Sequence, residues 1–186
     1  ITGLGKQRDT TTEDYFPQER IPAGFNGDVE RLNFLNSKEG LFTYKWGLYS
    51  AGHADLDVTK TIPAESIIRD REEGTFMLGD SGGFQIAKGL WEGDWTSETC
   101  PKAMKKRKLV VNWMEEYMDY GMMLDIPTWT FQDPKASEAS NIKSYDDAVT
   151  ATHINARYYM NNRRGNFKVL NVLQGSNHTN AESWYQ

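Results

Sequence analysis

Cysteine is almost absent from this chain, since Cys100 is the only one among 186 residues. A single thiol excludes an internal disulfide framework, and it also excludes a cysteine-rich zinc site built from this sequence alone. It fits a reducing compartment, and we expect a cytoplasmic protein.

Long apolar runs and an excess of positive charge are lacking as well. No stretch approaches the roughly 18 apolar residues of a membrane span, and no apolar signal-peptide core is present, so we expect no membrane partner. The 21 lysines and arginines are outnumbered by 26 aspartates and glutamates, which gives a net charge of -5. Any polyanion would therefore have to bind a local patch. The length predicts one domain, shorter than the ~250 residues of a complete eight-unit barrel.

The most informative stretch is an apolar run over 75–78 that leads through Gly79 to Asp80. The residues that follow it are Ser81, Gly82, Gly83, Phe84 and Gln85. We predict a short buried strand with a sharp turn at its carboxyl end, where parallel α/β sheets collect functional side chains. An isolated Asp-Ser-Gly-Gly could also be a turn whose aspartate caps the next segment. Phe84 and Gln85 favour a site, because they could stack on and hydrogen-bond a planar base.

Two further predicted strands also end on polar side chains. The apolar run 122–124 leads to Asp125, and the β-branched run 167–173 leads to Gln174. Repeating strand-helix units predict a parallel α/β sheet whose strand ends share one rim. Asp80, Asp125 and Gln174 would then converge on one pocket. Two carboxylates can divide acid and base roles, and a carboxylate with an amide matches the polar edge of a purine.

Two helices are predicted between these strands. Apolar residues recur at helical spacing over 109–118, and Gly121 is expected to end that helix. The second helix is expected to begin at Ser144, which has an acidic residue three positions further on. Its inward face is expected to hold Val149, His153, Ala156 and Met160. We interpret His153 as a core histidine with satisfied hydrogen bonds rather than as a ligand.

The N-terminal part of the chain is less informative. We divide the chain into a polar entry segment, residues 1–40, to which no function is assigned, and an α/β region, residues 41–186. Aromatic and β-favouring residues over 40–49 predict a strand or hairpin, and His53 is expected in the loop that follows. A short helix is predicted over 63–70.

A tryptophan-containing loop and a basic cluster follow Gln85. Trp91 and Trp95 could stack a nucleobase or ribose, or they could form a lid that packs on its own aromatics. The basic cluster consists of Lys102, Lys105, Lys106, Arg107 and Lys108. These side chains could neutralise phosphates, or they could be the solvated start of a helix. They are the best candidates for nucleic-acid contact in the sequence.

The motif Asp80-Ser81-Gly82-Gly83-Phe84-Gln85 resembles the signature of the tRNA-guanine transglycosylase superfamily. Asp125 and Gln174-Gly175 follow in the order of that family, and the resemblance covers roughly residues 40 to 180. It implies a TIM (β/α)8-type barrel enzyme that cuts the N-glycosidic bond of a guanosine and inserts a 7-deazaguanine base. The segment 125–128, Asp-Ile-Pro-Thr, is similar to archaeosine-type enzymes and to the branch, found in phages and bacterial DNA-modification clusters, that modifies DNA. We therefore favour DNA over tRNA as the acceptor.

Carried over by position, the resemblance makes Asp80 the general acid/base. The substrate-binding residues that it implies are Ser81, Gly82, Phe84, Gln85, Asp125, Gln174 and Gly175. The family's carboxylate nucleophile, which forms a covalent intermediate, belongs to a later barrel strand. Its zinc site of three cysteines and a histidine is also expected downstream of Gln186. The chain therefore looks like an N-terminal half, for which we expect an incomplete barrel, no cofactor, and no turnover by this chain alone.

The partners that the resemblance implies are DNA or tRNA, guanine and a 7-deazaguanine base, with either a homodimer or a second subunit. Two other interpretations stay open. One is a non-catalytic base-binding or nucleic-acid-binding subunit that works with a catalytic partner. The other is an unrelated glycoside hydrolase that uses paired carboxylates on a similar barrel.

Overall fold

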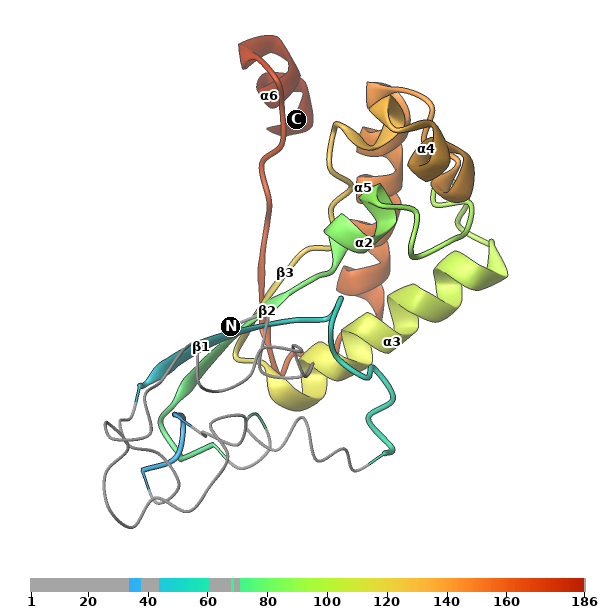
Figure 1. The fold of residues 1–186 in the computed structure, drawn as a ribbon. Coiled ribbons are helices and arrows are strands. Elements are labelled where there is room, and N and C mark those ends of the chain that lie inside the picture. Colours follow the sequence, from blue (N-terminus) through green and yellow to red (C-terminus); the bar gives the residue numbers. More distant parts are fainter. Residues whose placement is uncertain (1–33, 38–43, 61–67, 69–70, 186) are drawn as a thin grey trace, which may run out of the picture. The chain divides into compact units, whose positions relative to one another are not determined.

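The computed structural model describes residues 34–37, 44–60, 68 and 71–185 (Figure 1). The chain divides into two compact units, Ile1–Gly47 with Thr61–Phe76, and Leu48–Lys60 with Met77–Gln186. The predicted entry segment falls outside the described residues except for 34–37, and the helix predicted over 63–70 does so except for Ile68. Within the described ranges, no helix has both the length and the apolar character needed to cross a membrane.

The described residues of the first unit are held together mainly by backbone hydrogen bonds. Glu72 N donates to Leu35 O over 2.9 Å, and Ser37 N donates to the Glu72 carboxylate over 2.8 Å. The rings of Trp46 and Phe76 lie 6.0 Å apart. Leu35 is buried.

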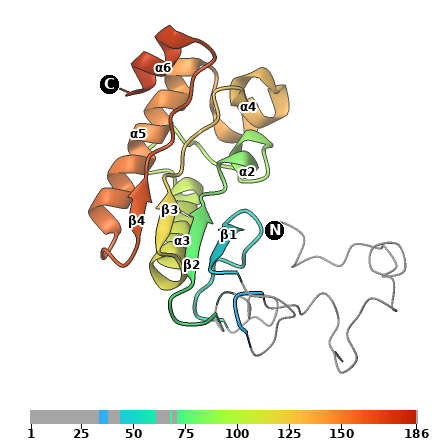
Figure 2. The same cartoon turned by 90° about the vertical axis from the view of Figure 1, so that its left-hand side faces the viewer.

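A four-stranded sheet has the strand order β1-β2-β3-β4. Its strands are β1 (Trp46–Ser50), β2 (Phe76–Asp80), β3 (Tyr120–Met122) and β4 (Lys168–Leu170). Strands β2, β3 and β4 run parallel, with Leu78 opposite Tyr120 and Tyr120 opposite Lys168 (Figure 2). The predicted parallel α/β class is therefore confirmed. The strand expected over 40–49 is found as β1, although residues 41–43 lie outside the described part.

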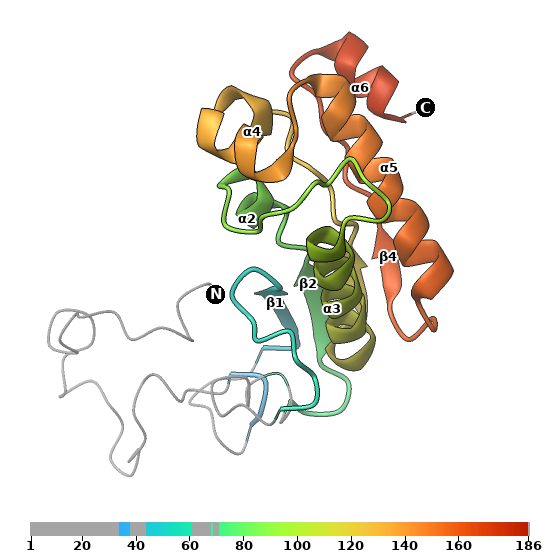
Figure 3. The same cartoon turned by 90° about the vertical axis from the view of Figure 1, so that its right-hand side faces the viewer.

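Two long helices, α3 (Pro101–Tyr117) and α5 (Tyr145–Asn162), lie along one face of the sheet (Figure 3). The shorter helices are α2 (Gly83–Ala87), α4 (Pro134–Ser140) and α6 (His178–Tyr185), with a 3-10 turn, η5, at Thr130–Gln132. Helices α3 and α5 are the crossovers between β2 and β3 and between β3 and β4, so consecutive strands become neighbours in the sheet. The segments that follow neighbouring strands are therefore brought side by side.

Gly121 lies inside β3 and does not end the preceding helix, so that prediction is wrong. The chain leaves α3 at Met118, and Asp119 enters the sheet at once because its amide donates to Met77 O over 3.0 Å. Glycine is needed at 121 for packing. A side chain there would lie 2.5 Å from Met114 Sδ and 2.8 Å from the Phe167 ring.

Helix α5 begins as predicted, because Ser144 Oγ accepts the amide of Asp147 over 3.1 Å. The predicted inward face is wrong, since His153 is exposed and Met160 is 55% exposed. The buried side chains of α5 are Ala148, Ala151, Thr152, Ile154, Asn155 and Tyr159. Two of them are polar and bond to the backbone beyond β3, so counting apolar residues selected the wrong side of the helix.

The last predicted strand is shorter than the apolar run 167–173. Strand β4 ends at Leu170, whose carbonyl accepts the amide of Met123 over 2.8 Å. Beyond it, Leu173 is 63% exposed, and Trp184 of α6 donates its indole N–H to Val172 O over 2.8 Å. This hydrogen bond anchors the segment between β4 and α6, which contains Gln174.

Candidate functional site

Asp80 lies at the carboxyl end of β2, directly before a tight turn. Gly82 has a φ of 84°, a left-handed conformation that glycine adopts without steric cost, and α2 begins at the next residue. Ser50 Oγ donates to Asp80 Oδ2 over 2.5 Å, and Ala51 N donates to Asp80 O over 2.9 Å. The end of β1 therefore fixes both the backbone and the carboxylate of Asp80.

Asp125 and Gln174, which the sequence predicts at one rim, are hydrogen-bonded to each other. Gln174 Nε2 donates to Asp125 Oδ2 over 2.6 Å. Burial raises the pKa of the Asp125 carboxyl, the bond from Gln174 opposes this shift, and the charge of Asp80 adds to it. The structure thus brings Asp125 and Gln174 into contact, although both lie beyond the ends of β3 and β4, and Asp80 lies close enough for its charge to act on Asp125.

The backbone on both sides of Asp125 is anchored by α5. Asn155 Nδ2 donates to Leu124 O over 2.7 Å, and Thr152 Oγ1 accepts the amide of Ile126 over 2.9 Å. The turn after β2 packs against the same segment, since a side chain on Gly83 would collide with Asp125 O. Asp125 therefore sits on rigid elements, which is the arrangement that binding sites require.

Gln85 and Ser81 are buried beside this turn, with exposed fractions of 6% and 1%. The Gln85 amide lies against Gly52, where an added side chain would collide with it. Gln85 Oε1 is buried and accepts no hydrogen bond from the described residues. A buried acceptor without a donor costs about 1 to 3 kcal/mol, so this amide is a candidate for contact with a ligand.

An aromatic surface is formed by Phe84 of α2 and by Trp129, which directly precedes η5. Phe84 is 54% exposed, and its ring meets that of Trp129 edge-on at a centroid distance of 6.0 Å. Lys88 Nζ lies 5.6 Å from the Phe84 centroid and 5.1 Å from that of Trp129. Neither Trp129 nor Lys88 was predicted from the sequence as a site residue. Their signals were an aromatic four residues after Asp125 and a lysine one helical turn after Phe84.

The basic cluster does not form one surface. Arg107 is buried, and its guanidinium donates to Asn155 Oδ1 over 2.7 Å, Trp95 O over 2.9 Å and Ser97 O over 3.0 Å. Phosphate contact by Arg107 is therefore a wrong prediction, because its donors are used inside the protein. Lys102 forms a 2.8 Å ion pair with Glu92, so its charge is already matched. Of the other three lysines, Lys105 and Lys108 are exposed, and Lys106 is half-buried.

The two tryptophans of the loop after Gln85 have different positions. Trp95 is fully buried and donates its indole N–H to Trp91 O over 3.1 Å, which is the internal packing that one interpretation expected. Trp91 is half-buried, touches Gly82, and carries Lys106 Nζ at 4.4 Å from its ring centroid. Only Trp91 is placed to contact a ligand.

Tyr159 of α5 is a buried titratable group below the rim. Its hydroxyl has no hydrogen-bond partner among the described residues. Burial raises the pKa of Tyr159 well above its ordinary value, and the charges of Asp125 and Asp80 raise it further. The phenol is therefore un-ionised at neutral pH.

Within the described residues, no group of three histidine, cysteine, aspartate or glutamate side chains is placed to hold a metal ion. No family model matches the sequence, and comparison with curated proteins and with solved structures found no match.

Proposed function

We propose that this chain carries the base-recognition site of a guanine transglycosylase-type enzyme, a pentosyltransferase that exchanges guanine for a 7-deazaguanine base in DNA, or in tRNA. The observation that supports the proposal most strongly is the hydrogen bond between Gln174 and Asp125 at the rim that also holds Asp80. We further propose that the four parallel strands belong to a TIM-type barrel, because such barrels gather their chemistry at the carboxyl ends of the strands.

Guanine presents two N–H donors, at N1 and at the exocyclic amine, beside the O6 acceptor. An ionised Asp125 accepts hydrogen bonds only, so it would take both donors, while the Gln174 amide would donate to O6. Without a base, the two side chains satisfy each other. In the same orientation, adenine would place its N1 acceptor and its C2–H against the buried Asp125 carboxylate, which would then receive no hydrogen bond from the base.

Asp80 is our candidate for the general acid/base that protonates the departing base and deprotonates the incoming one. Its surroundings differ from those of Asp125, because Asp80 is half-exposed and bonded to the Ser50 hydroxyl, whereas Asp125 is buried. Different surroundings allow two carboxyls to hold different protonation states. Phe84 would cover one face of the base. We assign no nucleophile to this chain, so binding of the base is the activity that we expect from it alone.

The direct test is a calorimetric titration of the purified chain with guanine, a 7-deazaguanine and adenine. We expect the first two bases to bind, and adenine to bind about tenfold more weakly or worse, which corresponds to ~1.4 kcal/mol for one unpaired buried group. Equal affinity for guanine and adenine would contradict the assigned roles of Asp125 and Gln174.

A second assay separates an enzyme from a binding subunit. Labelled guanine is offered together with guanine-containing DNA or tRNA, first with this chain and then with the chain plus a catalytic partner. Exchange only in the presence of the partner would establish a binding subunit, and the preferred acceptor would decide between DNA and tRNA. Binding of sugars without binding of guanine would instead support the glycoside hydrolase.

A further inference from the structure

A cleft adjoins the turn that follows Asp80. This cleft has a volume of about 450 Å³ and is lined by the turn after β1, by Trp91 and by α3. Trp91 connects it to the candidate site, because a side chain on Gly82 would lie 2.5 Å from the Trp91 ring. The cleft therefore lies next to Gly82, which is two residues after Asp80 in the sequence.

One wall of the cleft carries two lysines without acidic partners. Lys105 and Lys106 of α3 both line it, and neither forms an ion pair within the described part of the chain. Burial lowers the pKa of Lys106, and the neighbouring charge of Lys105 lowers it further. Two adjacent ammonium groups that repel each other favour a bound anion.

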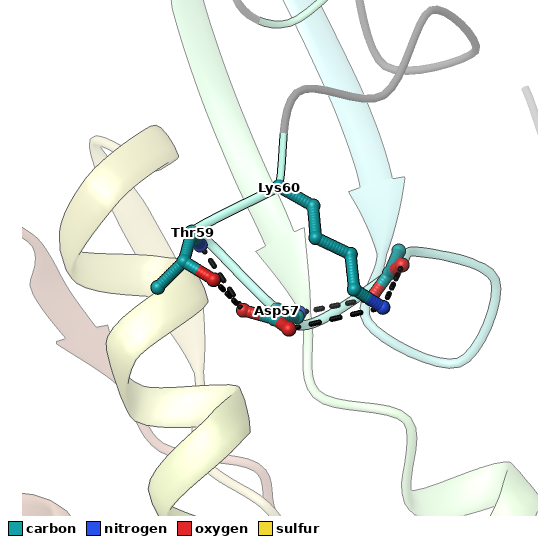
Figure 4. A network of polar contacts seen from close by, with 4 residues as sticks. Asp57, Thr59 and Lys60 are labelled. Atoms are coloured by element: carbon teal, nitrogen blue, oxygen red, sulfur yellow. Dashed lines mark hydrogen bonds and ion pairs between the residues drawn. The ribbon is translucent and has the colours of Figure 1, made fainter.

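The opposite wall carries acceptors that are already held in place (Figure 4). Asp57 Oδ1 accepts the amide of Thr59 over 3.1 Å and its hydroxyl over 2.6 Å. Lys60 Nζ lies 3.4 Å from Asp55 Oδ2 and 3.7 Å from Asp57 Oδ2, so it partly neutralises these carboxylates. Asp55 and Asp57 both line the cleft, and the Asp57 carboxylate is an acceptor for hydroxyl or amino groups.

These features together match one nucleotide: an anion site, an aromatic ring, and acceptors for the sugar or base, in a cleft of the size that small ligands occupy. We propose that the cleft binds the nucleotide next to the target guanosine on the same single strand. Its phosphodiester would lie on Lys105 and Lys106, and its base or sugar would pack on Trp91. This inference rests on the proposed function, because the contact between Trp91 and Gly82 makes the cleft a neighbour of the base site.

The test is fluorescence anisotropy with a fluorescein-labelled, single-stranded DNA of about ten nucleotides that contains one guanine. We expect Lys105→Gln and Lys106→Gln each to flatten the plot of log affinity against log salt by about 0.7, the value for one phosphate contact on a single strand. Trp91→Leu should weaken binding about tenfold, by loss of stacking. Lys168→Gln is the matched control, because Lys168 is an exposed lysine at the start of β4 that neither lines the cleft nor belongs to the basic cluster.

Titration of the same variants with free guanine distinguishes this inference from the proposed function. Free guanine has no phosphate, so its affinity should be unchanged in Lys105→Gln and Lys106→Gln. If the two variants change the salt dependence no more than Lys168→Gln does, or if the unmodified chain binds guanine but not the DNA, the cleft does not bind the strand. Lys105 is exposed, so Lys105→Gln keeps the test valid even if Trp91→Leu fails to fold.

Discussion

At the scale of single residues, Gln85 shows a conflict between stability and binding. Its side chain is buried, yet Oε1 accepts no hydrogen bond among the described residues. Methionine has a similar length and no polar atom that must be satisfied. We expect Gln85→Met to raise the free energy of unfolding in urea by about 1 kcal/mol and to weaken guanine binding.

Tyr159→Phe is the matched control for Gln85→Met. It also removes a buried polar atom without a partner, but from a side chain that we place outside the base site. It should be neutral or stabilising and leave guanine affinity unchanged. If Gln85→Met left guanine affinity unchanged as well, Gln85 would have no role in binding.

The place of a residue in the fold was predictable from the sequence where the neighbouring residues alone determine it. Asp80, Asp125 and Gln174 each end an apolar run, and parallel connections bring such ends together. Arg107 was misjudged because it lies among four lysines. Its position also precedes Val110, Val111 and Met114 by three, four and seven residues, which places it on the apolar face of α3. Helical spacing therefore predicts that Arg107 is buried, whereas its charge and its lysine neighbours suggested an exposed position.

At the scale of elements, the Arg107 guanidinium joins α3 to α5 and to the loop after α2. Its three hydrogen bonds reach Asn155, Trp95 O and Ser97 O. Lysine keeps the charge but lacks the planar fork, so it cannot satisfy all three acceptors. We expect Arg107→Lys to lower the free energy of unfolding by about 2 kcal/mol in urea denaturation.

Lys108→Gln is the control for this prediction, since Lys108 is an exposed neighbour on the same helix. It should change stability by no more than about 0.5 kcal/mol. Equal stability of Arg107→Lys and the unmodified chain would show that the guanidinium does not join these elements.

The positions of the helices were predicted better than the face that each helix turns to the core. The periodicity over 109–118 and the cap at Ser144 identified α3 and α5, because local propensity and capping determine where helices form. The inward face of α5 was missed because Thr152 and Asn155 bond to the backbone around Asp125. Those bonds depend on tertiary structure, which no periodicity of apolar residues encodes.

At the scale of the whole molecule, Asp125 links the stability of the fold to pH. Burial raises the pKa of its carboxyl in the folded protein. A group with a raised pKa binds its proton more tightly when folded, so it adds stability at low pH. That contribution is lost as the pH rises from about 4, the ordinary pKa of aspartate, through the raised value.

Asparagine at position 125 cannot titrate, which isolates this effect. We expect the free energy of unfolding of the unmodified chain to fall relative to that of Asp125→Asn between about pH 4 and pH 7. Urea denaturation at several pH values measures the difference. A constant difference across this range would show that the pKa of Asp125 is the same in the folded and unfolded chain.

The α/β class of the molecule was predictable, because alternating strands and helices leave few other arrangements. Closure into a barrel does not follow from four parallel strands and stays part of the proposal. The start of β3 was missed because Gly121 resembles a helix end in sequence, whereas the fold needs it for the approach of Met114 and Phe167.

The central claim, that Asp125 reads guanine, is tested most directly by titrating Asp125→Asn with guanine. The matched control is Glu116→Gln, which makes the same chemical change at an exposed position on α3. We predict that Asp125→Asn loses guanine binding by at least about tenfold, because the asparagine amide directs a donor at the donors of the base. Glu116→Gln should bind as the unmodified chain does. Unchanged guanine affinity in a folded Asp125→Asn protein would contradict the account.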